Sequence, residues 1–347
     1  MGQSDEVTRA LLEALSAETG HKISFRRAPQ RIGGGFWAQI YGFELDHAPA
    51  AFVGPLVLRV MPDAVAGRRE TIVQRWLADT GYRTPSVLAS GTAPGLGAAF
   101  MVMPLAEGRS PLTGLRLGPA LFRLRPILKT LPAILVDAAL QLHACEPAGL
   151  RVLLDDAGVE ASELGAAPYL AALEGATSNQ SSGFDLLRSW FDDHRPTPAN
   201  AVVCHGDLHP FNLLIDDRGT VTVLDWTSAT LAPREMDIGF TAALLRCAPI
   251  GVPGPLRPII ARITTHLATS FIDSYRNTTE IDAPAVEWWE ALQHARCLAD
   301  LAHGRLTPGS VVGPLHPFET SARAMTDRTR RLTGIAVVLP ERVRIGM

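Results

Sequence analysis

One short segment of the sequence concentrates the side chains that could perform acid–base or metal chemistry. His205, Asp207, His209, Asn212 and Asp225 all lie within CHGDLHPFNLLIDDRGTVTVLDW. Runs of alternating residues flank the turn-forming sequence DDRG, a pattern that predicts a β-hairpin. Because a hairpin would return Asp225 to the neighbourhood of Asn212, a carboxylate and an amide oxygen could share one site. Mg²⁺ prefers oxygen ligands of this kind, usually together with water and phosphate oxygens.

Two readings of the first part of this segment are open. Asp207 precedes Asn212 by five residues, the spacing between the base and the metal-binding asparagine in the kinase catalytic loop. Alternatively, His205, Asp207 and His209 alternate as H-x-D-x-H, and on a strand all three would face one way, as zinc or manganese ligands of a metal-dependent hydrolase could. Pro210 and the lack of a second histidine cluster disfavour that alternative.

Composition limits the class of protein to a globular one of about two lobes. The chain has 347 residues, with 47% hydrophobic and 19% charged residues. A net charge of -3 lacks the basic excess of nucleic-acid-binding proteins, so no nucleic-acid partner is expected. Apolar runs are too short to span a membrane, no signal peptide is recognisable, and the four cysteines form no C-x-x-C pair. We therefore expect a cytoplasmic protein with no membrane partner.

The pattern of apolar residues predicts a small antiparallel sheet followed by a mostly helical part. The first 105 residues predict helices at 5–19 and 67–81 and strands at 23–28, 36–45, 56–61, 86–90 and 98–103. After residue 121 longer helical patterns dominate, and the hairpin at 212–225 is the one clear β element. In the helical segment 287–305 we expect the tryptophans to be core residues and the acids to be solvated.

The segments HGDLHPFNLLID, VLDW and APREMDIGF together resemble the signature of the aminoglycoside phosphotransferase and choline kinase family, small-molecule kinases with a protein-kinase-like fold. The resemblance extends over roughly residues 20–245. It implies an α+β, two-lobe fold with a nucleotide-binding N-lobe at residues 1–105. A larger, mostly helical C-lobe at 106–347 would then hold the catalytic loop and the substrate site.

Carried over to this chain, the family's pattern assigns Asp207 as the catalytic residue that orients the substrate hydroxyl and accepts its proton. Asn212 and Asp225 would hold the Mg²⁺ that bridges the nucleotide phosphates. His205 and Asp237 match scaffold residues that bond the catalytic loop and hold its backbone.

The resemblance also implies the nucleotide contacts of the N-terminal part, at Gly33, Gly34, Gly35, Arg59, Glu70, Met103 and Leu105. The glycines would cover the phosphates, and backbone groups around Met103 and Leu105 would meet the adenine. Arg59 stands where protein kinases have a lysine, and it would pair with Glu70 and the phosphates. Arginine can bridge phosphates through its planar fork, although it is larger than lysine.

These features predict a kinase that transfers the γ-phosphate of ATP or GTP to a hydroxyl of a small-molecule acceptor. A protein kinase is disfavoured, because no D-F-G follows and APRE begins at Ala232, which leaves no room for a long activation loop. A catalytically silent member that binds a nucleotide or metabolite is the second alternative. The net charge gives only a slight acidic bias, where a polycationic aminoglycoside would want a strongly acidic lobe, so sugars, amino alcohols, macrolides and nucleoside-like acceptors stay open.

Overall fold

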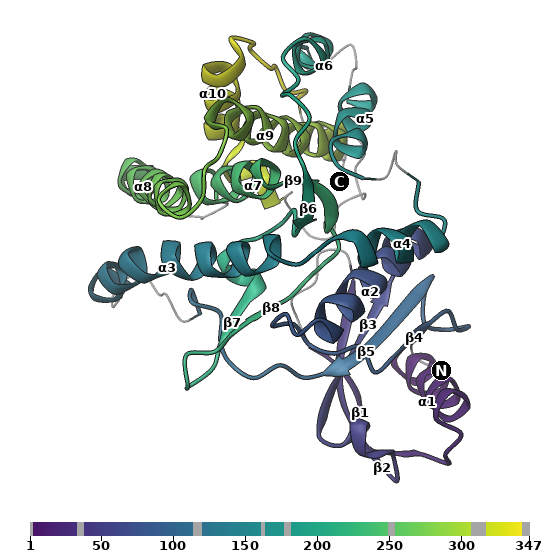
Figure 1. The fold of residues 1–347 in the computed structure, drawn as a ribbon. Coiled ribbons are helices and arrows are strands. Elements are labelled where there is room, and N and C mark those ends of the chain that lie inside the picture. The colour runs from purple at the N-terminus through teal and green to yellow at the C-terminus, as the bar shows by residue number, and fades with distance from the viewer. Residues whose placement is uncertain are drawn as a thin grey trace, which may run out of the picture. The chain divides into compact units, whose positions relative to one another are not determined.

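A computed structural model describes residues 3–32, 38–113, 120–160, 164–176, 182–248, 254–306 and 317–341. The chain forms two compact units (Figure 1). The first consists of Met1–Pro111, Ala148–Val159 and Phe211–Ala229, and the second of the remaining segments. Within the described ranges, no helix combines the length and apolar character needed to cross a membrane.

The strands of the first unit are β1 (Ser24–Arg31), β2 (Gln39–Asp46), β3 (Pro55–Met61), β4 (Ala89–Gly91), β5 (Ala99–Pro104), β7 (Leu213–Ile215) and β8 (Val221–Val223), and its helices are α1 (Gln3–Thr19), α2 (Ala64–Asp79) and α4 (Ala148–Asp156). The second unit contains β6 (Ala201–Cys204) and β9 (Thr230–Pro233), together with α3 (Ala120–His143), α5 (Ala167–Gly175), α6 (Phe184–Asp193), α7 (Arg234–Arg246), α8 (Arg257–Arg276), α9 (Ala283–Leu306) and α10 (Ala322–Thr333).

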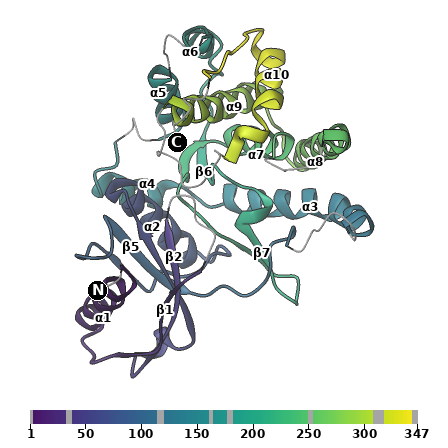
Figure 2. The ribbon, with the colours of Figure 1, turned by 180° about the vertical axis from the view of Figure 1, so that it is seen from behind.

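An antiparallel sheet in the order β1-β2-β3-β5-β4 organises the first unit. Helix α1 packs Val7, Leu11 and Leu15 against one face of this sheet. On the other face α2 approaches closely: a Cβ built on Gly67 would lie 2.8 Å from the Cβ of Ala99. Both α1 and α2 can be followed beside the strands in Figures 1 and 2. Because successive side chains of β3 point to opposite faces of the sheet, this strand contributes to the apolar layer under α1 and to the one under α2.

The predicted order of elements in the first 105 residues is confirmed. Helix α2 begins earlier than the expected residue 67, because Asp63 caps it and its Oδ1 accepts a hydrogen bond from the N–H of Ala66 at 2.8 Å. The hairpin signal at 212–225 is also confirmed by the antiparallel pair β7–β8. The mixed α+β class with a small antiparallel sheet is thus the observed one.

The second unit is built around α9, which packs against α5, α6, α7 and α10. These helices surround α9 in both ribbon views (Figures 1 and 2). The tryptophans of α9 are core residues as predicted, with Trp288 3% and Trp289 5% exposed. The prediction of solvated acids on this helix is wrong for Glu290, which is 1% exposed because Arg328 donates two hydrogen bonds to its carboxylate.

A short antiparallel pair, β6–β9, was not expected from the sequence, where the hairpin is the one clear β element of the helical part. It sets Cys204 opposite Thr230 and places the end of β6 directly before His205. The pair therefore fixes the start of the loop that carries Asp207.

Candidate active site

Arg59 lies in a buried charged cluster of the first unit. Its side chain extends from β3 and is 10% exposed, and Glu70 on α2 is 1% exposed. The Nη2 atom of Arg59 lies 3.0 Å from Oε1 of Glu70 and 3.3 Å from Oδ1 of Asp225. The predicted pairing of Arg59 with Glu70 is therefore present. One guanidinium between two carboxylates also leaves these three groups with one net negative charge.

Thr227 joins this cluster, and sequence reasoning missed it. Its Oγ1 lies 2.7 Å from Oδ1 of Asp225 and 3.1 Å from Oε2 of Glu70, and it accepts a hydrogen bond from Nη2 of Arg59 at 3.3 Å. A hydroxyl has one hydrogen, so it donates to one carboxylate at a time, and the shorter contact is to Asp225. The only signal in the sequence is its position two residues after Asp225.

Burial and charge act in opposite directions on the ionisable groups of this cluster. Burial raises the pKa of Glu70, the charge of Arg59 lowers it, and the charge of Asp225 raises it, with a net result above the ordinary value. For Arg59, burial lowers the pKa, but Glu70 and Asp225 together raise it above its usual value. Arg59 is therefore a permanent cation that faces two acids.

The β7–β8 hairpin brings the two predicted metal ligands into one neighbourhood. The N–H of Leu224 donates to the carbonyl oxygen of Asn212 at 2.9 Å, next to the pairing of Leu213 with Val223. Asp225 follows directly, with a left-handed φ of 66°, a conformation that aspartate tolerates better than most residues. An amide oxygen and a carboxylate are the kinds of oxygen donor that Mg²⁺ takes, so the side chains at these two positions fit such an ion chemically.

Trp226 anchors the residue next to this site. Its side chain is fully buried, and its Nε1–H donates to Oγ1 of Thr84 at 2.8 Å. The ring also packs edge-on against Tyr82, with the centroids 5.6 Å apart. Asp225 is thus held between a hydrogen-bonded hairpin and a buried indole, which restricts where its carboxylate can point.

Asp207 belongs to the second unit, in the loop after β6. Its side chain is 34% exposed and lies 3.4 Å from Nε2 of His209, and its backbone N–H donates to Nδ1 of His205 at 3.2 Å. The hydrolase alternative required these three residues on a strand, but β6 ends at Cys204 and His205 is fully buried. The loop therefore presents Asp207 to solvent while His205 faces inward.

Asp237 holds the backbone of this loop, the scaffold role that the resemblance implies. The N–H of His205 donates to its Oδ2 at 2.7 Å, and the N–H of Gly206 donates to its Oδ1 at 2.6 Å. His143 lies 3.1 Å from Oδ2 through Nε2, and its Nδ1 is 2.7 Å from the hydroxyl of Tyr275. Burial raises the pKa of Asp237, but hydrogen bonding and charge from His143 reduce it to below the usual value.

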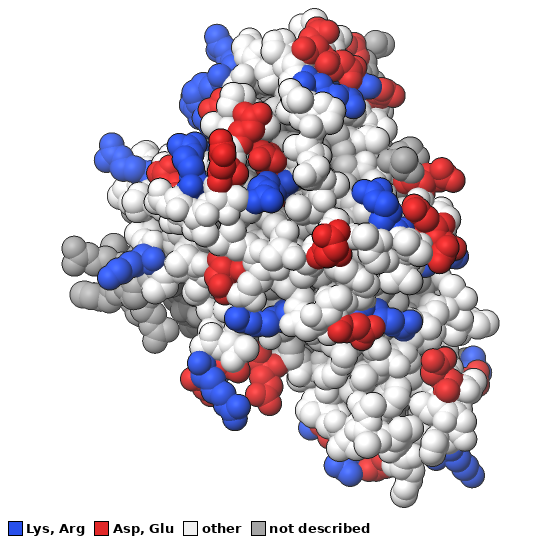
Figure 3. All heavy atoms as spheres, in the orientation of Figure 1, with Lys and Arg blue, Asp and Glu red and all other residues white. Residues whose placement is uncertain are grey.

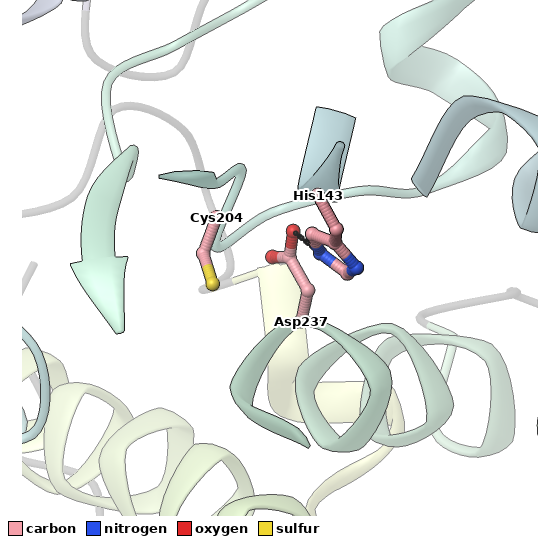
Figure 4. A group of neighbouring side chains, drawn as sticks. All are labelled: His143, Cys204 and Asp237. Carbon is pink, nitrogen blue, oxygen red and sulfur yellow. Dashed lines mark hydrogen bonds and ion pairs between the residues drawn. The ribbon is translucent and has the colours of Figure 1, made fainter. Parts of the chain in front are cut away.

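His143, Cys204 and Asp237 lie close enough to suggest a metal site (Figure 4). Each ligand atom is already used: the Cys204 thiol is within 3.5 Å of the carbonyl oxygen of Ala232, and Asp237 accepts the bonds described above. Burial raises the pKa of the Cys204 thiol well above its usual value, which opposes formation of the thiolate that binds metals. These three side chains therefore form part of the structural support of the loop that follows β6.

The predicted adenine contacts lie on β5 and just after it. Met103 is buried and pairs with Val57, and the N–H of Leu105 donates to the carbonyl oxygen of Pro55 at 2.9 Å. These backbone groups therefore face β3. Because successive residues of a strand present their backbone groups to opposite sides, Pro104 directs its carbonyl oxygen away from β3. Gly33, Gly34 and Gly35 lie outside the described residues.

Comparison with known proteins identifies similar chains. The model of the phosphotransferase enzyme family matches residues 30–268. The Bacillus subtilis protein YcbJ is 45% identical over 55 residues, a match that spans 16% of this chain and 18% of that protein's length.

Three solved structures have similar folds. A Ralstonia eutropha protein whose structure was assigned to the aminoglycoside phosphotransferases by its similarity has 18% identity and a TM-score of 0.63, and the match covers 93% of this chain and 97% of that one. Plasmodium vivax ethanolamine kinase has 14% identity and a TM-score of 0.57, covering 87% and 81%. A mutant of aminoglycoside phosphotransferase APH(4)-Ia, solved with ADP and hygromycin B, has 15% identity and a TM-score of 0.52, covering 93% and 98%. The predicted protein-kinase-like fold is confirmed.

Proposed function

Because this chain belongs to the phosphotransferase enzyme family, we propose that it is a small-molecule kinase that transfers the γ-phosphate of ATP or GTP to a hydroxyl group. The family membership confirms the predicted enzyme class, a phosphotransferase. The observation that carries the proposal is the cluster of Arg59, Glu70 and Asp225, because it joins a phosphate-binding cation to a metal-binding carboxylate.

In the proposed reaction, the acceptor hydroxyl gives its proton to the carboxylate of Asp207 while its oxygen bonds to the γ-phosphorus. The bond from that phosphorus to the bridging oxygen breaks, and the nucleoside diphosphate leaves with the electron pair. A positioned base contributes about 10²- to 10⁴-fold to such a reaction. Asp207 is suited to this role because its side chain is partly exposed while its backbone is tied to His205.

The residues of the first unit would bind the nucleotide. Asn212 and Asp225 would hold Mg²⁺, which when bound neutralises the charge of the phosphates. Arg59 would donate hydrogen bonds to phosphate oxygens from its fork, and Glu70 would hold it in place. The carbonyl oxygen of Pro104 is the acceptor best placed for the adenine amino group, because it points away from β3, whereas Met103 pairs with Val57 inside the sheet.

We assign nucleotide binding to residues 1–105 and the catalytic loop and acceptor site to 106–347, with the two metal ligands supplied by the hairpin. The acceptor is proposed to be a small hydroxylated molecule. On the face of Figure 3 acidic and basic side chains are interspersed, in keeping with the net charge of -3. This distribution favours a neutral or weakly charged acceptor over a polycation.

Thermal unfolding of the purified protein with ATP or GTP, each with Mg²⁺ or with a chelator, tests nucleotide binding. A ligand at 100 times its dissociation constant stabilises the folded state by about 2.7 kcal/mol. We expect a rise in the unfolding temperature that requires both nucleotide and Mg²⁺. Asp225→Asn should abolish the Mg²⁺-dependent rise, because it removes the charged ligand.

Transfer is then tested by detecting a phosphorylated product across a panel of sugars, amino alcohols, macrolides and nucleosides. Asp207→Asn should keep the nucleotide-dependent shift and lose at least a hundredfold in rate. Asp217→Asn makes the same chemical change on an exposed residue of the β7–β8 turn and should leave the rate unchanged. Equal rates for Asp207→Asn and the unmodified protein would refute the base role. A nucleotide shift with no transfer to any acceptor would instead favour the catalytically silent alternative.

A further inference from the structure

Arg59 contacts the same carboxylate oxygen of Asp225 that Thr227 contacts. Nη2 of Arg59 lies 3.3 Å from Oδ1 of Asp225, and Oγ1 of Thr227 lies 2.7 Å from the same atom. The Arg59 side chain is 10% exposed, so little water screens its charge. One oxygen of a proposed metal ligand is thus bound by a permanent cation.

We propose that Arg59 competes with the divalent metal for Asp225, so that the metal binds well only after nucleotide phosphates have drawn the guanidinium away. This inference rests on the proposed function, because it takes Asp225 as a metal ligand and the phosphates as the partners of Arg59. It goes beyond the proposed function because it assigns to Arg59 the coupling between nucleotide binding and metal binding.

The charges of the cluster support this competition. Arg59 neutralises one of two acids, and a divalent ion at Asp225 would sit next to its positive charge. Two cations separated by a few ångströms repel strongly where water is scarce. Negatively charged phosphate oxygens would attract the guanidinium away from Asp225. The positive charge that repels the metal would then no longer lie next to this carboxylate, and the metal could bind there.

The geometry supports an alternative position for Arg59. A single atom, Nη2, makes the contacts to Glu70, Asp225 and Thr227, at 3.0, 3.3 and 3.3 Å. Because one nitrogen makes all three contacts, moving it toward a phosphate would release the Asp225 and Thr227 contacts together. Thr227 can keep Asp225 oriented during the exchange, because its hydroxyl bonds Oδ1 independently of Arg59.

Coupling of this kind is reciprocal, and it can be measured without catalysis. The probe is Mn²⁺ alone, with its binding to the purified protein followed by calorimetry or by the electron paramagnetic resonance of the free ion. The double variant Arg59→Met/Glu70→Gln removes the guanidinium and also the buried carboxylate that would otherwise lose its partner. We expect it to bind Mn²⁺ at least tenfold more tightly than the unmodified protein.

Arg69→Met is the matched control. Arg69 is on the same helix as Glu70, and its Nη2 donates to the backbone carbonyl of Thr227 at 3.0 Å. The Arg69→Met variant removes one positive charge from the same neighbourhood but keeps the contact between Arg59 and Asp225. Its affinity for Mn²⁺ should therefore change less than threefold. Adding Asp225→Asn to the double variant should cancel the gain. Thermal unfolding of each variant verifies that the binding is measured on folded protein.

Two results would overturn the inference in distinguishable ways. If the double variant binds Mn²⁺ no more tightly than the unmodified protein, while Asp225→Asn still abolishes the nucleotide-dependent metal binding, the competition is refuted and the proposed kinase site stands. If the unmodified protein binds no Mn²⁺ even with ATP present, the proposed function fails and this inference fails with it.

Discussion

The carboxylate of Asp237 accepts a hydrogen bond from the backbone N–H of His205 at 2.7 Å. A second bond, from the N–H of Gly206 to the other carboxylate oxygen, is 2.6 Å long. Two oxygens of one buried side chain thus fix two successive peptide groups directly before Asp207. The position of the proposed base is therefore set in part from α7, in addition to the local bond from its N–H to His205.

Replacing Asp237 with asparagine should destabilise the second unit and disturb this loop. The amide has one acceptor oxygen where the carboxylate has two, so one buried N–H loses its partner, at a cost of about 1–3 kcal/mol. We expect a lower urea midpoint and a reduced transfer rate. Asp217→Asn, on an exposed turn, should change neither, and an Asp237→Asn protein with an unchanged urea midpoint would contradict the scaffold role.

The proximity of Asn212 and Asp225 could be predicted from the sequence, because the turn and the alternating runs that create it are local. The pairing of Arg59 with Glu70 was predicted only through the family resemblance, since ten residues and a helix start separate them. Thr227 could not have been found in this way: its contact to Glu70 joins residues 157 positions apart. Its hydroxyl reaches Arg59 and Glu70 only because β3 and α2, which carry these residues, lie next to it in the folded protein.

The β6–β9 pair was missed for a related reason. Each strand has four residues, too few to show a period, and 25 residues separate Cys204 from Thr230. The burial of Glu290 was missed because a helical pattern shows which face an acid occupies but not whether arginines of other helices reach it. Local signals thus predicted elements and their order, whereas long-range polar contacts needed the fold.

Trp226 should contribute to the stability of the first unit through one hydrogen bond as well as through its apolar area. Trp226→Phe removes the bond to Thr84 and part of the contact with Tyr82, and should lower the free energy of unfolding by about 1–3 kcal/mol. Thr84→Val isolates the hydrogen bond, and the double variant completes a cycle measured by urea unfolding. Fully additive losses would show that the bond contributes nothing.

Gly239 permits the close approach of α7 to α9. A Cβ built there would lie 2.7 Å from the backbone nitrogen of Glu290 and 2.7 Å from the carbonyl oxygen of Val286. Because backbone cannot move aside cheaply, Gly239→Ala should destabilise the protein by about 1–3 kcal/mol. Gly175→Ala, at the end of α5, where the added Cβ meets no described atom within 4 Å beyond its neighbours and its own helix backbone, should be neutral or slightly stabilising. Similar thermal midpoints for the two variants would refute the steric argument.

Glu290 should make the stability of the second unit sensitive to acid. Its carboxylate accepts hydrogen bonds from Arg328 at 2.8 and 2.9 Å and lies 3.0 Å from Nε of Arg246. Burial raises the pKa of Glu290, but hydrogen bonds from His294 and Arg328 together with nearby positive charge lower it to about 2, from an ordinary value of 4.5. The folded state therefore binds this proton less readily than the unfolded state does.

A lowered folded-state pKa contributes stability that is fully present above pH 4.5 and is lost as the pH falls towards 2. The loss from this group is about 3 kcal/mol in total, of which about 2 kcal/mol occurs by pH 3. Glu290→Gln should lower the free energy of unfolding at pH 7 and flatten its fall between pH 5 and pH 3, as measured by urea unfolding. Glu287→Gln, an exposed change on the same helix, should retain the full slope. If the Glu290→Gln slope matched that of the unmodified protein, the ion-pair account of this cluster would be wrong.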